Sequence, residues 1–69
     1  MIHKKETPDS SSIARFAWDD ASEELTVHFV SGHAAIYRGV PRSEFEAMRK
    51  ARSAGGHHNA CIRQKYATR

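Results

Sequence analysis

Leu25-Thr26-Val27-His28-Phe29-Val30-Ser31-Gly32-His33-Ala34-Ala35-Ile36-Tyr37-Arg38 is the stretch that decides the fold. From Leu25 to Phe29 apolar residues alternate with polar ones, which is the period-two pattern of a half-buried strand. Ser31 and Gly32 then supply a turn, and the residues from His33 to Arg38 form a returning strand. This stretch therefore predicts an antiparallel hairpin.

Two turn geometries fit this hairpin, and they differ in what happens to Tyr37. A two-residue turn pairs Val27 with Ile36 and leaves Tyr37 exposed. A three-residue loop, with Gly32 left-handed as a bulge, pairs Val27 with Ala35 and buries Tyr37. A shift of one residue turns every side chain of a strand to the other face, so the two registers imply different surfaces. The sequence leaves both open.

Outward from the hairpin, the chain predicts one more strand and two helices. Residues 13–18 are expected to form a first strand. Ser43 with Glu46 forms a capping-box pattern, so a helix should begin near Ser43 and end at Gly55-Gly56. A last short helix should run from about residue 57 to 66. We expect an α+β fold, a three-stranded antiparallel meander followed by two short helices packed on one sheet face.

Length and cysteine content limit the organisation of the chain. Its 69 residues allow one small domain, which we place at residues 9–66, between a flexible N-terminal tail at 1–8 and a frayed C-terminus at 67–69. The single cysteine, Cys61, excludes an internal disulfide and fits a reducing cytoplasm. No apolar stretch approaches the ~20 residues of a membrane span, so no membrane partner is expected.

Charge is distributed unevenly along the chain. Residues 1–40 carry four Lys or Arg against six Asp or Glu, whereas residues 41–69 carry seven against two. A basic region of this kind attracts phosphate backbones or acidic protein faces, although its long side chains can also serve to cover a small core. The predicted nucleic-acid-binding residues are Arg42, Arg49, Lys50, Arg52, Arg63, Lys65, Tyr37 and Asn59.

The two uncharged members of this set have separate roles. Tyr37, with His28 and His33, would stack on unpaired bases if the two-residue turn holds. Asn59 lies one i,i+4 step from Arg63, and the pair offers donors to a phosphate or carboxylate. A structural alternative competes, in which Asn59 anchors the glycine loop and Arg63 bonds a strand carbonyl.

The order of several short motifs points to a family. They are Ser10-Ser11-x-Ile13, Trp18-Asp19, Leu25-x-Val27-x-Phe29-x-Ser31-Gly32, Tyr37-x-Gly39-Val40-Pro41 and Asn59-x-x-Ile62-Arg63-x-x-Tyr66. In order and spacing they closely resemble the KTSC domain over roughly residues 9 to 66. That family takes its name from the C-terminal extension of some lysyl-tRNA synthetases, so the resemblance implies a small domain associated with RNA. Two positions depart from it, because Ala35 and His58 stand where the family usually has aromatics.

The histidines raise two further hypotheses. His57 and Cys61 are an i,i+4 pair that can bind zinc, with His28 or His33 as a further ligand. That ligand set is incomplete, and a lone cysteine often packs as a small hydrophobe, so no metal or other cofactor is expected. The same histidines are candidate acid–base groups of a ribonuclease. No phosphate loop, nucleophile elbow or carboxylate pair accompanies them, so neither enzyme activity nor a small-molecule substrate is expected.

These features predict a small non-enzymatic accessory module that binds nucleic acid through a basic helical face, and the family resemblance implies that this nucleic acid is RNA. The alternative is a protein-interaction module that docks on an acidic surface of a transcription, translation or phage-related complex. A salt-sensitive affinity would indicate the first and a salt-resistant one the second.

Overall fold

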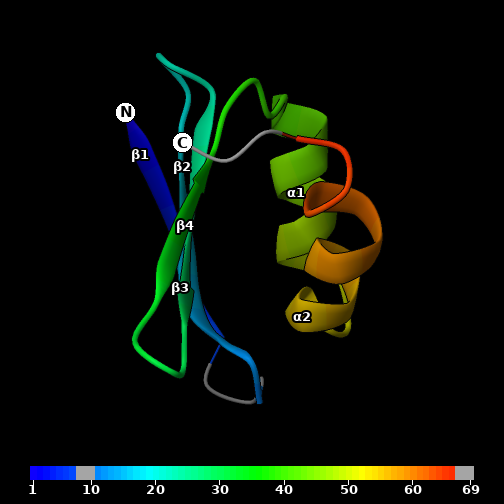
Figure 1. Ribbon diagram of the computed structural model, residues 1–69. Helices are drawn as coiled ribbons and strands as arrows, with labels where there is room; N and C mark the ends of the chain where they lie inside the picture. Colours follow the sequence, from blue (N-terminus) through cyan, green and yellow to red (C-terminus); the bar gives the residue numbers. More distant parts are fainter. Residues whose placement is uncertain (8–10, 67–69) are drawn as a thin grey trace.

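The fold is an antiparallel sheet covered on one face by short helices (Figure 1). The structure, a computed structural model, describes residues 1–7 and 11–66 apart from the side chains of Ala54 and Asn59. Within these residues the sheet has four strands in the order β1-β2-β3-β4. Their bounds are β1 (Ile2–Glu6), β2 (Ile13–Asp19), β3 (Glu24–Phe29) and β4 (Ala34–Tyr37). The helices are α1 (Arg42–Lys50), α2 (Ala54–His57) and the π-helix η1 (His58–Ile62). The α+β class is confirmed.

The expected three-stranded sheet is wrong, because part of the predicted N-terminal tail forms β1. This strand pairs with β2 along its whole length, from Ile2 opposite Asp19 to Glu6 opposite Arg15. Its sequence lacks apolar alternation, so the strand depends on backbone pairing with β2 and on one packed side chain. That side chain is His3, whose ring lies 5.7 Å from the ring of Trp18. The predicted frayed residues 67–69 lie outside the described part of the chain.

The β3–β4 hairpin has the three-residue loop. Leu25 pairs with Tyr37 and Val27 with Ala35, which is the register that buries Tyr37. Gly32 has a φ of 101°, a conformation that residues with a Cβ rarely adopt. Of the two registers that the sequence allows, the structure therefore has the one in which Gly32 forms a bulge.

A bulge in β2 allows Ile13 and Phe16 both to face the core, although their spacing does not fit regular strand alternation. Ile13 and Phe16 are three positions apart, so regular alternation would place them on opposite faces. The ladder shifts register between Ile13 and Arg15, and the extra residue is Ala14. Both apolar side chains are consequently buried, while Arg15 joins His28 on the opposite face.

The core lies between the sheet and the helices. Trp18 stacks on Phe45 of α1 with ring centres 5.4 Å apart, and its indole N–H donates a 2.8 Å hydrogen bond to the carbonyl of Val40. This bond satisfies a polar group that would otherwise be costly to bury. The buried apolar residues are Ile13, Phe16, Trp18, Leu25, Val27, Tyr37, Val40, Phe45, Met48 and Ile62.

The helix boundaries differ from the expectation. Pro41 is the N-cap of α1, and no side chain makes a capping hydrogen bond there, so the predicted capping box does not form. The helix ends at Lys50 because Ala51 is extended, and Gly55 and Gly56 lie inside α2 rather than ending α1. The last helical segment thus spans 54–62 and not 57–66. No described helix is long and apolar enough to cross a bilayer.

Candidate nucleic-acid interface

All six predicted cations are exposed, and all belong to the helical third of the chain. Three lie on α1, one lies in the link to α2, and two follow η1. They are Arg42, Arg49, Lys50, Arg52, Arg63 and Lys65.

Two of these cations are paired with glutamates of the same layer. Arg49 binds Glu46 through contacts of 2.8 and 3.1 Å, and its hydrogen bonds hold the pKa of Glu46 below the usual range. Lys65 donates to Glu44 at 3.3 Å. Such exposed pairs contribute little to stability, and a phosphate can compete for the cation.

The other four cations have no carboxylate within 4.0 Å among residues 1–7 and 11–66. They are Arg42, Lys50, Arg52 and Arg63. The predicted alternative for Arg63, a hydrogen bond to a strand carbonyl, is likewise not seen within those ranges. These four side chains retain their full charge at the surface, where they can attract a polyanion.

The acidic loop between β2 and β3 is occupied elsewhere and does not neutralise the helical cations. Asp20 accepts hydrogen bonds from the N-terminal amine at 2.8 Å and from His3 at 3.1 Å, which lower its pKa. Glu24 lies 4.0 Å from Arg38. The printed ion pairs of these loop carboxylates are therefore made with the N-terminus, His3 and Arg38 and not with the helical cations.

Tyr37 does not belong to this surface. Its side chain is 3% exposed, and its hydroxyl lies 2.6 Å from Nε2 of His58. Burial raises the pKa of Tyr37, and the positive charge of Arg63 opposes that shift. A ring enclosed in this way offers no face to a base, so its predicted stacking role is corrected. Asn59 lies in η1, but its side chain is outside the described atoms.

His58 takes part in the same buried contact. Its ring packs edge-on against Phe29 and Tyr37, with ring centres 5.4 and 5.3 Å apart. The position where the family usually has an aromatic before the asparagine is thus a core position in this chain. Histidine at this position therefore changes the packing of the core and does not alter a surface on which bases could stack.

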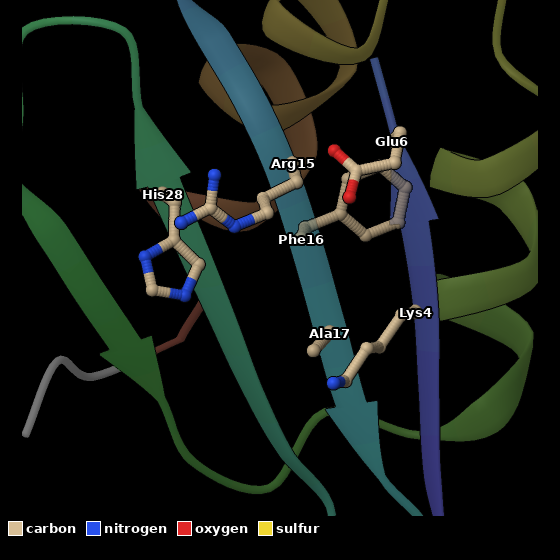
Figure 2. A pocket seen from close by; sticks show the side chains of 6 residues that line it. All are labelled: Lys4, Glu6, Arg15, Phe16, Ala17 and His28. Carbon is tan, nitrogen blue, oxygen red and sulfur yellow. The ribbon is translucent and has the colours of Figure 1, made fainter.

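The open face of the sheet carries the cations Lys4 and Arg15, which were not predicted as site residues. Lys4, Arg15 and His28 line a shallow hollow of about 190 Å³ together with Glu6. Figure 2 shows the Arg15 side chain reaching toward His28, and the Lys4 side chain reaching toward Ala17. The charge count over residues 1–40 did not reveal this group, because the acidic residues at the end of the sheet make the net charge of that range negative. The signal available in the sequence was the alternation of side chains along β2 and β3, which places Arg15 and His28 on the same face of the sheet.

Among the described residues, one group has side chains suited to a metal ion. Glu44, His57 and Cys61 place their ligand atoms within 4.8 Å of one another. His57 and Cys61 are the pair that the sequence singled out, whereas Glu44 was missed because it lies on α1. The predicted further ligands do not join them, since His28 lines the hollow on the open face.

The comparisons with known proteins establish the family. A model of the KTSC domain matches residues 9–66, so the chain belongs to the KTSC domain family. It is 36% identical over 59 residues, 86% of its length, to a lysine–tRNA ligase of Nostoc punctiforme, and it spans 10% of that ligase. The crystal structure of a KTSC domain protein from Yersinia pestis matches with a TM-score of 0.90 at 23% identity, over 100% of this chain and 96% of that one. The latter match shows the fold.

Proposed function

We propose that this domain is a non-enzymatic accessory module that binds RNA through the exposed cations of its helical layer. The observation that carries the proposal is the group of four cations, Arg42, Lys50, Arg52 and Arg63, that have no carboxylate partner among the described residues. Positive charge held in this way favours contact with a phosphate backbone over internal ion pairing.

The lysine–tRNA ligase relative supports RNA as the polyanion. A ligase of that name acts on tRNA, and the matched segment is 36% identical to this chain. Because the chain spans 10% of the ligase, the aminoacylation activity of that protein is not carried over. The transferable element is association with an RNA substrate in a reducing cytoplasm.

The burial of Tyr37 determines the binding mode that we propose. Because the buried ring of Tyr37 cannot stack on a base, affinity comes mainly from phosphate contacts and carries little sequence preference. Four contacts to single-stranded RNA would give a log–log salt slope of about −3. Affinity should then fall about 50-fold between 50 and 200 mM salt (~0.7 units of slope per phosphate).

Fluorescence anisotropy with an unstructured RNA oligonucleotide tests the proposal. The charge reversal Lys50→Glu with Arg52→Glu should weaken binding by at least about tenfold at low salt. The matched control is Lys4→Glu with Arg15→Glu, which changes the net charge equally but on the open sheet face. This control should bind several-fold more tightly than the helical variant.

Two results contradict the proposal. Absence of any salt-sensitive binding by the unaltered chain would remove RNA as the ligand. A larger loss in the sheet-face control than in the helical variant would transfer the interface to the hollow at Lys4 and Arg15. Circular dichroism of both variants shows that the fold is retained.

A protein partner with an acidic surface is the second candidate, and the buried Tyr37 favours it. Base stacking supplies much of the affinity of single-strand binders, and the buried ring of Tyr37 cannot supply it. Capture from lysate with and without nuclease distinguishes the two. A partner that persists after nuclease treatment, and that is lost with Lys50→Glu and Arg52→Glu, supports docking on protein.

A further inference from the structure

Glu44, His57 and Cys61 form a cluster that connects α1 with the later segment made of α2 and η1. Glu44 lies on α1, His57 ends α2, and Cys61 lies in η1. Their ligand atoms lie within 4.8 Å of one another, and Nε2 of His57 is 3.5 Å from Oε1 of Glu44. All three side chains are half-buried, so the group is partly shielded from solvent.

The His57 nitrogen in this cluster is unsatisfied. Its Nε2 is shielded from solvent and has no hydrogen-bond partner among the described residues, although Glu44 lies 3.5 Å away. When the imidazole is neutral with the proton on Nδ1, a lone pair faces a carboxylate oxygen. Two electron-pair donors in this arrangement repel each other, and a cation between them removes the repulsion.

The second oxygen of Glu44 is already held by other residues. Its Oε2 accepts hydrogen bonds from the Tyr66 hydroxyl at 2.9 Å and from Lys65 at 3.3 Å. These bonds fix the carboxylate so that Oε1 is the atom nearest His57. Metal-ligating carboxylates are oriented by outer hydrogen bonds in the same way.

The local helix geometry brings the other two ligands together. His57 and Cys61 are four residues apart across the junction of α2 and η1, so their side chains lie on the same side of the segment. Within η1 the N–H of Arg63 bonds the carbonyl of His58 at 2.8 Å, which is an i→i+5 turn. Turns of this kind occur frequently at functional sites.

We propose that Glu44, His57 and Cys61 form a binding site for a zinc ion. A carboxylate oxygen, an imidazole nitrogen and a thiolate are the ligand types that zinc takes. Ligand atoms of a tetrahedral zinc lie about 3.3 to 3.6 Å apart, which the distance between His57 and Glu44 already matches. Three protein ligands leave one position for water or an exogenous ligand.

Charge balance supports the assignment. The Glu44 carboxylate and the Cys61 thiolate together neutralise a dication, and binding releases the thiol proton. Lys65 contacts the far oxygen of Glu44, and its side chain is 65% exposed, so its ammonium group can turn into solvent when the metal binds. The bound ion would tie α1 to the last helical segment.

Cobalt(II) titration of the full reduced chain, followed by competition with zinc, tests this site. The expected result is a saturable visible spectrum with a thiolate-to-metal band, about one ion per chain, that zinc abolishes. Cys61→Ser should remove the thiolate band, and His57→Asn should weaken binding more than 100-fold. The matched control, His33→Asn, changes a fully exposed histidine of the hairpin loop and should leave the affinity unchanged.

An outer-partner variant separates a built site from an adventitious one. Tyr66→Phe keeps all three ligands but removes the shorter of the two hydrogen bonds to Oε2 of Glu44, and it should weaken zinc binding about 10- to 100-fold. Absence of saturable binding by the unaltered chain would overturn the proposal. A thiolate band that survives in Cys61→Ser, or an equal loss in the His33 control, would overturn it too. Circular dichroism on each variant confirms that folding is intact.

Discussion

Tyr37 shows how one side chain can change from a surface group to a core group. Its ring belongs to the cluster beneath the sheet, and its hydroxyl lies 2.6 Å from Nε2 of His58. The sequence allowed either outcome, because the register of the hairpin determines the face. The hydroxyl therefore contributes to the stability of the fold through its contact with His58.

Tyr37→Phe should lower the free energy of unfolding by about 1–3 kcal/mol, because the substitution removes a buried hydrogen bond without creating a cavity. Urea unfolding followed by the fluorescence of Trp18 measures this loss. RNA affinity should be unchanged in the same variant. Reduced affinity with unaltered stability would instead place the tyrosine at the interface.

The β3–β4 hairpin determines which side chains of β4 face the core and which face the surface. The N–H of Phe29 donates a 2.8 Å hydrogen bond to the carbonyl of His33, which closes the loop. Within this loop Gly32 has a φ of 101°. This loop aligns Leu25 with Tyr37 and places Ala35 toward the core. A turn shorter by one residue would turn the other face of β4 toward the core, so a different set of side chains would be buried.

Gly32→Ala should cost about 1–2 kcal/mol of unfolding free energy, because a Cβ is strained at this φ even though the space around it is open. Gly56→Ala is the control. It lies in α2, where its Cβ would meet only the rotatable Oγ of Ser53 at 3.3 Å, and helix propensity should offset that contact. Equal losses in the two variants would argue against the left-handed loop.

At the scale of the whole molecule, the ends of the sheet and the helical layer differ in charge. Carboxylates between β2 and β3 are bound by the N-terminal amine, His3 and Arg38, whereas the helical cations remain mostly unpaired. The buried Tyr37 hydroxyl contacts His58, and the half-buried Tyr66 hydroxyl donates to Glu44. The pH dependence of stability should therefore report on those groups.

Stability should be highest at intermediate pH. Burial raises the pKa values of Tyr37 and Tyr66, so the contribution of the neutral phenols is present below about pH 10 and is lost as pH rises through the raised values. Burial alone would raise the pKa of Glu44, but hydrogen bonds from Tyr66 and Lys65 outweigh it and lower the pKa. Its contribution is present above about pH 4.5 and is lost as pH falls through the lowered value.

Urea midpoints measured from pH 3 to 11 with a chelator present check this profile. The chelator keeps metal binding from altering the titration of Glu44. A midpoint that rises between pH 10 and 11, or that rises as pH falls below 4, would contradict these pKa shifts.

The sequence by itself determined the strands of the hairpin, the strand before it and the first helix, because the local signals for these elements are read within a few residues. Only the tertiary structure decided the role of β1, whose residues carry no apolar pattern and depend on pairing with β2. It also decided which face Tyr37 takes, the meeting of Lys4 with Arg15 and His28, and the approach of Glu44 to His57 and Cys61. These outcomes depend on contacts between residues that are distant in the chain, and such contacts form only when the sheet and helices pack.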